Sequence, residues 1–142
     1  MTDPAAQRTS DVNGRLWGAR ARDWAEVQEG QFGAGYDDVL SRVGVGPGIR
    51  LLDVGCGAGS AVLLMAHTFP NSTFTGYDIS QFALDRARMK LDASGLPNAA
   101  FHDPRQQGLP EDESLDLVCT FDCIHDMAHP QQVIEAIRAS LK

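Results

Sequence analysis

The stretch that decides the fold is Asp53-Val54-Gly55-Cys56-Gly57-Ala58-Gly59, a glycine-rich loop between two apolar segments. Residues 49–54, which lead into it, form a near-continuous apolar run that is typical of a buried parallel strand. Residues 60–68 are apolar all round, which predicts a buried helix whose free N–H groups face the loop. Three glycines at alternate positions let the backbone turn tightly and let a ligand approach without meeting a Cβ atom. This unit predicts a ligand site at the carboxyl edge of a sheet.

The remainder of the C-terminal part alternates between strand-like and helix-like segments. Further strands are predicted at residues 73–77, 99–102 and 115–121, and further helices at residues 80–93, capped by Ser80, and from Pro130 onward. This alternation implies right-handed crossovers. The predicted fold is therefore α/β, a Rossmann-like parallel sheet with helices on both faces.

The first 48 residues have a different pattern. Apolar and aromatic residues, among them Trp17 and Trp24, recur there at helical spacing until glycines and a proline break the pattern at 44–48. We expect the two tryptophans to pack in the core, with the lining of an acceptor pocket as the alternative. The chain is thus predicted to comprise a helical segment, residues 1–48, and an α/β core, residues 49–142.

Composition and charge narrow the class of partner. A chain of 142 residues is about one domain, and 12 basic against 19 acidic residues give a net charge of −7. That charge opposes a phosphate backbone, so we expect no nucleic-acid partner. The longest apolar run, residues 61–66, is far short of the roughly 20 residues that span a bilayer. The N-terminus does not resemble a signal peptide, and the three cysteines are an odd number, so we expect a cytoplasmic protein with reduced thiols and no membrane contact.

Two acidic residues indicate the chemistry of the ligand. The dinucleotide fingerprint needs its third glycine at position 60, where this chain has Ser60. Asp53, directly before the loop, would repel a diphosphate and attract an amino group or another cation. Asp78 follows the second predicted strand, where its two acceptor oxygens suit the hydroxyls of a ribose and Ile79 beside it can cover an adenine. The alternative is that Asp78 only begins the next helix, where an acid suits the dipole.

The order of Asp53, the glycine loop, Asp78 and the strand segment that begins at Leu115 resembles the class I S-adenosylmethionine (SAM)-dependent methyltransferase family, of the small-molecule type. The resemblance implies that SAM is the cofactor. It also implies which residues contact the cofactor. The methionine end and the sugar are held by Asp53 and by the loop residues Gly55, Cys56, Gly57 and Gly59. Asp78 binds the ribose, Ile79 packs on adenine, and the segment from Phe121 to Asp126 faces cofactor and substrate. The segment from Trp17 to Trp24 is similar to the helix that covers the cofactor in such enzymes.

Two departures from the family pattern stand out. Asp103 is at the position that contacts the adenine amino group, but Pro104 after it has no N–H to offer the adenine ring. We also expect the chain to stop within the helix after the fourth strand, without the family's last strands. An open fourth-strand edge would then be exposed, and it predicts pairing between two chains in a homodimer.

Several alternatives remain open from the sequence. His125 and Asp126 are the candidate general bases, with an ordinary loop histidine as an equally good interpretation. Zinc is disfavoured because Cys119 and Cys123 lie too far apart along a strand to share one ion, so no metal is predicted. The predicted function is SAM-dependent methyl transfer to an O, N or C nucleophile of a small molecule. The alternatives are a catalytically silent or truncated SAM-binding module and, less favoured, a nicotinamide (NAD)-dependent oxidoreductase.

Overall fold

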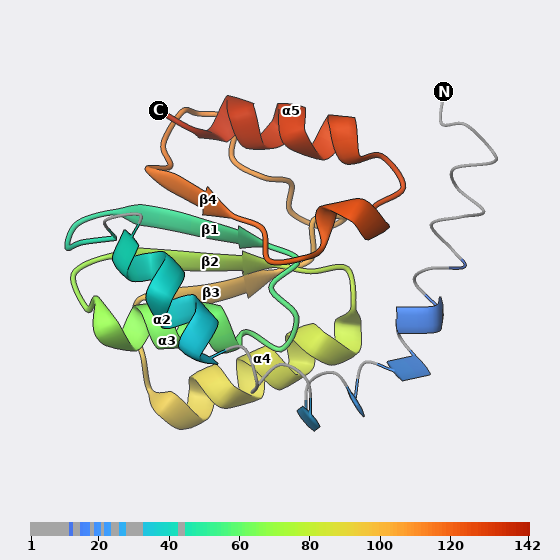
Figure 1. Cartoon of the computed structure of the whole chain (residues 1–142), viewed down its shortest axis with the longest axis horizontal. Coiled ribbons are helices and arrows are strands. Elements are labelled where there is room, and N and C mark those ends of the chain that lie inside the picture. The colour runs from blue at the N-terminus through green and yellow to red at the C-terminus, as the bar shows by residue number, and fades with distance from the viewer. Residues whose placement is uncertain are drawn as a thin grey trace.

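The computed structural model describes residues 12, 15–17, 19–20, 22–23, 26–27, 33–42 and 45–142. Four parallel strands form one sheet in the order β3-β2-β1-β4 (Figure 1). In chain order the elements are α2 (Gly33–Arg42), β1 (Arg50–Val54), α3 (Ser60–Thr68), β2 (Thr73–Tyr77), α4 (Gln81–Ser94), β3 (Ala99–His102), β4 (Leu117–Cys119), the 3-10 turn η3 (Ile124–Asp126) and α5 (Pro130–Ser140). The predicted α/β fold with a parallel sheet is confirmed.

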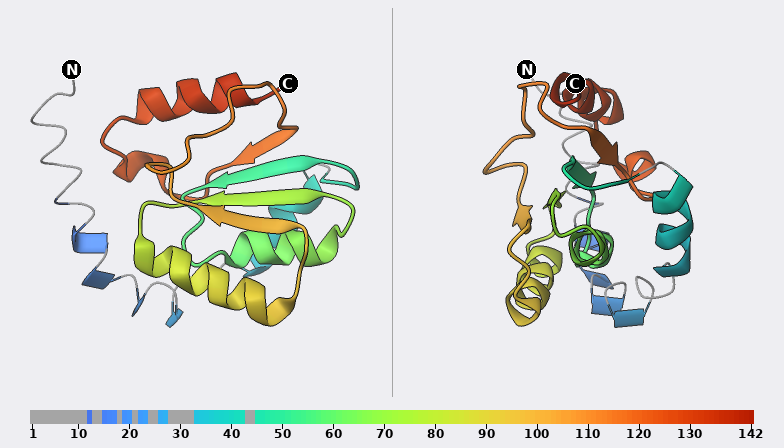
Figure 2. Two further views of the ribbon diagram at one scale, coloured as in Figure 1. Left: turned by 180° about the vertical axis from the view of Figure 1, so that it is seen from behind. Right: turned by 90° about the vertical axis from the view of Figure 1, so that its left-hand side faces the viewer.

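The two faces of the sheet are covered by different helices, because successive side chains of a strand point to opposite sides. Leu51 of β1 pairs in register with Phe74 of β2, and both belong to a core that includes residues of α3 and α4. Leu52, next along β1, lies on the other face in a second core, against which Val133 of α5 packs. The end-on view of Figure 2 shows α3 and α4 on one side of the sheet and α5 on the other.

Helix α4 begins and ends where the sequence predicts. Ser80 is its N-cap, and the Ser80 side chain accepts a hydrogen bond from the Ala83 N–H at 3.3 Å. Gly95 ends it in the left-handed conformation, at φ 66°, and donates its N–H to Leu91. The capping fixes the start of α4 directly after Asp78 and Ile79. These two residues therefore lie at the carboxyl edge of the sheet.

The fourth strand is shorter than predicted. Only Leu117–Cys119 pairs with β1, whereas a strand over 115–121 was expected. Leu115 instead forms a parallel bridge with Leu141, and Asp122, beyond the strand, turns the chain with φ 52°. Helix α5 ends at Ser140 and Leu141 is already extended, so the expectation that the last residues are helical is wrong for Leu141. β4 is at the edge of the sheet, as predicted, while pairing between chains stays a prediction.

The N-terminal part is described only in pieces. Helix α2 lies within the segment predicted to be helical, and Glu26 forms an ion pair of 3.0 Å with Arg86 of α4. Trp17 is 44% exposed, so the expectation that it packs in the core is wrong, and Trp24 lies outside the described residues. In both broad views of the ribbon the described pieces between residues 12 and 27, in blue, lie at the end to which the strands point (Figures 1 and 2). No helix in the described part of the chain is long and apolar enough to span a membrane.

Candidate functional site

The glycine loop is tied to the end of the neighbouring strand. The N–H groups of Gly55 and Cys56 both donate to the Tyr77 carbonyl, at 2.8 and 3.0 Å. Gly57 donates its N–H to Oδ2 of Asp78 at 2.9 Å. Gly55, Gly57 and Gly59 have φ angles of 79°, 55° and 79°, a region that residues with a Cβ rarely adopt. These contacts hold the loop against the carboxyl end of β2, where the sequence places the ligand.

The space at two of the loop glycines is taken up by the protein itself. A Cβ on Gly55 would lie 2.6 Å from the Cys123 sulfur, and one on Gly59 would lie 2.6 Å from the Phe101 ring. The Cys123 thiol donates to the Val54 carbonyl at 3.0 Å, which locks the segment after β4 beneath the loop. The absent Cβ atoms therefore allow close packing, and not only the ligand approach that the sequence predicts.

Cys56 also contributes to packing. Its side chain is buried, and its sulfur lies on Gly76, where an added Cβ would be 2.7 Å away. The Cys56 N–H donates to the Tyr77 carbonyl. Cys56 was predicted to contact the cofactor, but both its side chain and its N–H make contacts within the protein.

Asp78 is held in the orientation that its predicted role needs. Its Oδ2 accepts the Gly57 N–H and its Oδ1 accepts the Ser80 N–H at 2.8 Å. The backbone N–H of Ile79 also bonds to this carboxylate. A carboxylate has about four acceptor positions, so the protein does not use all of them. Burial raises the pKa of Asp78, and the backbone hydrogen bonds from Ser80 and Gly57 counteract this rise. The alternative that Asp78 serves only the helix dipole is not needed, since Ser80 caps α4.

Several carboxylates gather at the carboxyl edge of the sheet. Asp53 is almost fully buried, with 1% of its surface exposed. Burial, together with the negative charge of Asp53, raises the pKa of Cys119 to about 12. Burial also raises the pKa of Cys123 to about 12, and the carboxylates that add to this effect are Asp53, Asp78, Asp122 and Asp126. Four carboxylates, from β1, from the loop after β2 and from the segment after β4, thus act on the Cys123 thiol below Gly55.

Asp103 makes contacts that the sequence did not predict. It is 4% exposed, and its Oδ1 accepts both the backbone N–H and Nε of Arg105, each at 2.9 Å. Nη2 of Arg105 donates to Oδ2 of Asp103 at 2.7 Å and to the Ile79 carbonyl at 2.8 Å. These hydrogen bonds from Arg105 hold the pKa of Asp103 below its usual value. Arg105 therefore joins the ends of β2 and β3 beside the Ile79 side chain, which is 53% exposed.

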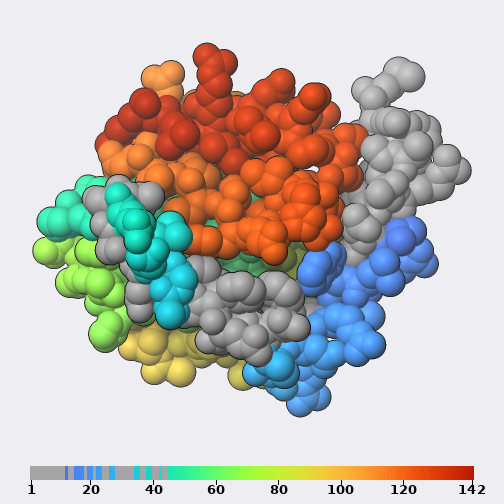
Figure 3. All heavy atoms as spheres, viewed as in Figure 1, coloured from blue at the N-terminus to red at the C-terminus, as the bar shows by residue number. Residues whose placement is uncertain are grey.

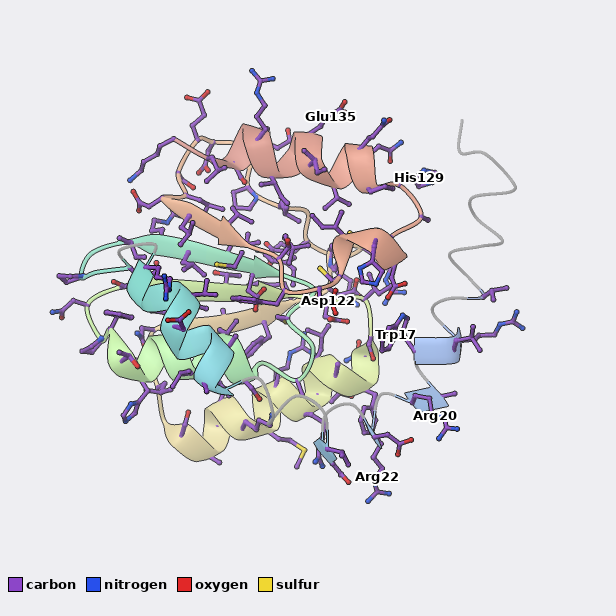
Figure 4. The ribbon with its side chains drawn as sticks, in the orientation of Figure 1. Trp17, Arg20, Arg22, Asp122, His129 and Glu135 are labelled. Carbon is purple, nitrogen blue, oxygen red and sulfur yellow. The ribbon has the colours of Figure 1, made fainter. Side chains whose placement is uncertain are left out.

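The segment after β4 forms an open depression. It has a volume of about 510 Å³ and is lined by Thr120, Asp122, Cys123, Ile124, His125 and Pro130. Nδ1 of His125 lies 3.6 Å from Asp122 and its Nε2 lies 3.4 Å from Asp126. Figure 4 shows Asp122 at the end of the sheet that also faces the segment carrying Trp17. Phe121, just before the depression, packs against the α3/α4 core with its side chain partly buried.

The distance argument against zinc does not apply as stated, because β4 ends at Cys119 and does not continue through Cys123. The two thiols serve the fold instead, with high pKa values and the Cys123 hydrogen bond to Val54. Among residues 45–142 and the other described residues, no group of three or more His, Cys, Asp or Glu side chains is placed to hold a metal ion.

The structure adds two residues that sequence reasoning missed. Arg105 neutralises Asp103, and Lys90 of α4 donates to the Ala58 carbonyl and to the Ser60 hydroxyl, at 3.0 and 3.1 Å. The Asp103-Pro104-Arg105 sequence carried a usable signal, because aspartate commonly accepts the N–H two residues on in a turn. Nothing in the sequence marked Lys90.

Comparison with known proteins decides the family. A profile described as "Methyltransferase domain" matches residues 46–142, the part of the chain that holds the sheet and the loop. The chain belongs to the class I SAM-dependent methyltransferase family. The match confirms the predicted family, fold and cofactor.

Its relatives include methyltransferases and one protein that is named for a different reaction. It is 30% identical to trans-aconitate 2-methyltransferase of Variovorax paradoxus over 105 residues, 73% of this chain and 39% of the relative. The 4+2 cyclase SpnF is 30% identical with a TM-score of 0.68, covering 75% of this chain and 40% of that protein. The fold also matches a Thiobacillus denitrificans SAM-dependent methyltransferase crystallised with S-adenosylhomocysteine, at 22% identity and a TM-score of 0.65, covering 78% and 44% of the two chains. The chain spans less than half the length of each of these three proteins.

Proposed function

We propose that this chain binds SAM at the carboxyl edge of its sheet and transfers a methyl group to an O, N or C atom of a small molecule. The observation that carries the proposal is the gathering of four carboxylates around the glycine loop: Asp53 in β1, Asp78 directly after β2, and Asp122 and Asp126 after β4. Such an edge attracts the sulfonium and ammonium groups of SAM and repels a diphosphate. The same negative charge argues against NAD as the ligand, because NAD contains a diphosphate.

The residues of the edge fit the parts of this cofactor. Asp78 retains acceptor capacity for the ribose, and Ile79 presents an exposed apolar side chain beside it. Asp53 is too enclosed for direct contact, so its contribution to binding the amino group is its negative field. When bound, SAM supplies an electrophilic methyl group on a sulfur that leaves readily.

The residues after β4 would serve the acceptor. Displacement at a methyl group is in line, so the main task of the protein is to align the acceptor with the methyl group. Asp122 lies 3.6 Å from Nδ1 of His125 and Asp126 lies 3.4 Å from its Nε2, on opposite sides of the ring. His125 is therefore suited to take a proton from an acceptor that must lose one, with Asp122 and Asp126 orienting its ring.

A small-molecule acceptor is supported by charge and by relatives. The net charge of −7 opposes a nucleic-acid acceptor. The relative from Variovorax paradoxus is a trans-aconitate methyltransferase, and a ubiquinone biosynthesis O-methyltransferase of Dinoroseobacter shibae is 29% identical over 79% of this chain. The residues after β4 belong to the orange part of the molecular surface in Figure 3.

The experiment is incubation of the chain with methyl-labelled SAM and a panel of small carboxylic acids, phenols and amines. We expect label in at least one acceptor, and about thirtyfold less transfer by Asp78→Asn at SAM concentrations below the dissociation constant. The matched control is Asp85→Asn, an exposed aspartate of α4 that should leave transfer unchanged. Tight SAM binding without transfer to any acceptor would favour the silent SAM-binding module, and absence of binding would refute the proposal.

A further inference from the structure

Asp103 and Arg105 form a unit whose exposed part is the cation. Arg105 contributes three donor groups to Asp103, namely its backbone N–H, Nε and Nη2. Asp103 is nearly inaccessible, while the Arg105 side chain is 64% exposed. A molecule that approaches the end of β3 therefore meets guanidinium N–H groups, and the carboxylate behind them already has its acceptor positions occupied.

The unit lies next to the predicted adenine position. Nη2 of Arg105 reaches the carbonyl of Ile79, the residue proposed to cover an adenine face. The charge of Asp78 also acts on Arg105, and Asp78 and Asp103 act on each other, which places all three at one edge. Pro104, between Asp103 and Arg105, has no N–H, so the nearest backbone donor is that of Arg105, which is given to Asp103.

We propose that Arg105, and not Asp103, contacts the edge of the purine base, so that the site presents hydrogen-bond donors where an acidic residue would present acceptors. This inference rests on the proposed cofactor. The guanidinium N–H groups of Arg105 donate to acceptor atoms of the base and make no hydrogen bond with the adenine amino group. The site then tolerates a base whose amino group is replaced by a carbonyl oxygen.

Contact by Asp103 and contact by Arg105 predict different effects on affinity when the amino group of the base is replaced by a carbonyl oxygen. A buried carboxylate that reads the amino group would be left facing a carbonyl oxygen, and sites of that kind reject the altered ligand by about a hundredfold or more. Deamination also places a hydrogen on N1 of the base, whereas N7 is an acceptor in both bases. A guanidinium on the N7 side donates to N7 and to the new carbonyl oxygen, so the altered base binds at least comparably.

The test compares S-adenosylhomocysteine with S-inosylhomocysteine, its deaminated form, by isothermal titration calorimetry on the native chain. We expect the two dissociation constants to differ by less than about tenfold. A preference for the adenosyl ligand of tenfold or more would overturn the inference while leaving the proposed cofactor intact. If neither ligand binds, the proposed function itself fails, and the inference with it.

Arg105→Ala supplies the second arm. Without the guanidinium, Asp103 becomes free to accept from the amino group, and the preference for the adenosyl ligand should rise about tenfold. The matched control is Arg138→Ala, an exposed arginine of α5 on the other face of the sheet, which should leave the ratio unchanged. An unchanged ratio in Arg105→Ala would contradict the inference.

Asp103→Asn keeps the inference falsifiable if Arg105→Ala does not fold. Loss of the carboxylate releases Arg105, so both ligands should weaken by the same factor. Weakening of the adenosyl ligand alone would show that Asp103 reads the amino group.

Discussion

Replacing Asp78 with asparagine separates ligand binding from folding at the carboxyl edge. The two carboxylate oxygens accept N–H groups from Gly57 and Ser80, at 2.9 and 2.8 Å, and the carboxylate retains acceptor capacity toward the ligand. Asparagine has nearly the same shape but only one acceptor oxygen. The substitution should therefore remove one ribose hydrogen bond and the negative charge that strengthens the other.

The magnitude follows from the type of bond. A hydrogen bond to a charged group contributes about 1.5–3 kcal/mol, so loss of one such bond weakens S-adenosylhomocysteine binding by about thirtyfold. The fold should lose little. The amide gives up one backbone N–H partner, at about 1 kcal/mol. Against this, burial raises the pKa of Asp78, so its ionised form costs stability above that pKa, and asparagine relieves this cost at neutral pH.

Calorimetric titration of S-adenosylhomocysteine and thermal unfolding of the same samples measure both effects. Asp85→Asn, which removes an exposed carboxylate of α4, should change neither. Affinity in Asp78→Asn within about threefold of the native value would refute the ribose assignment, because a lost charged hydrogen bond cannot cost so little.

The remaining predictions concern the loop, the base and the Asp103 pair. Gly59→Ala should lower the free energy of unfolding by about 2–4 kcal/mol in urea, since its φ is +79° and its Cβ would meet Phe101, whereas Gly108→Ala, in open space, should be near neutral. His125→Ala should lower turnover at least about a hundredfold without changing S-adenosylhomocysteine affinity, and reduced affinity would instead assign His125 to the cofactor. The pKa of Asp103 lies below 3.8, so its ionised form stabilises the fold above that pH. The stability advantage of the native chain over Asp103→Asn should shrink as pH falls below about 4, and a pH-independent difference would contradict this.

Local patterns in the sequence were sufficient for the sheet and for the loop. The apolar run before Gly55 predicted β1, and Ser80 predicted the start of α4, because caps and buried strands depend on neighbouring residues. The fourth strand was predicted too long, because its length depends on pairing with β1 and on the turn at Asp122, which periodicity does not encode.

The candidate site was predicted in position but not in its contacts. Asp78 takes the orientation expected of it, since it follows a strand and precedes a capped helix. The packing of Cys123 against Gly55 joins residues nearly seventy positions apart, and no local pattern reports such a contact. Arg105 was missed for another reason. Its role depends on which group faces outward once Asp103 is buried.

The most direct measurement is the affinity of the native chain for S-adenosylhomocysteine and for NAD, titrated under identical low-salt conditions. An edge shaped by four carboxylates should bind the amino acid nucleoside and show no heat with the diphosphate. Binding of NAD with no response to S-adenosylhomocysteine would contradict the electrostatic account and, with it, the assignment of every contact to the cofactor.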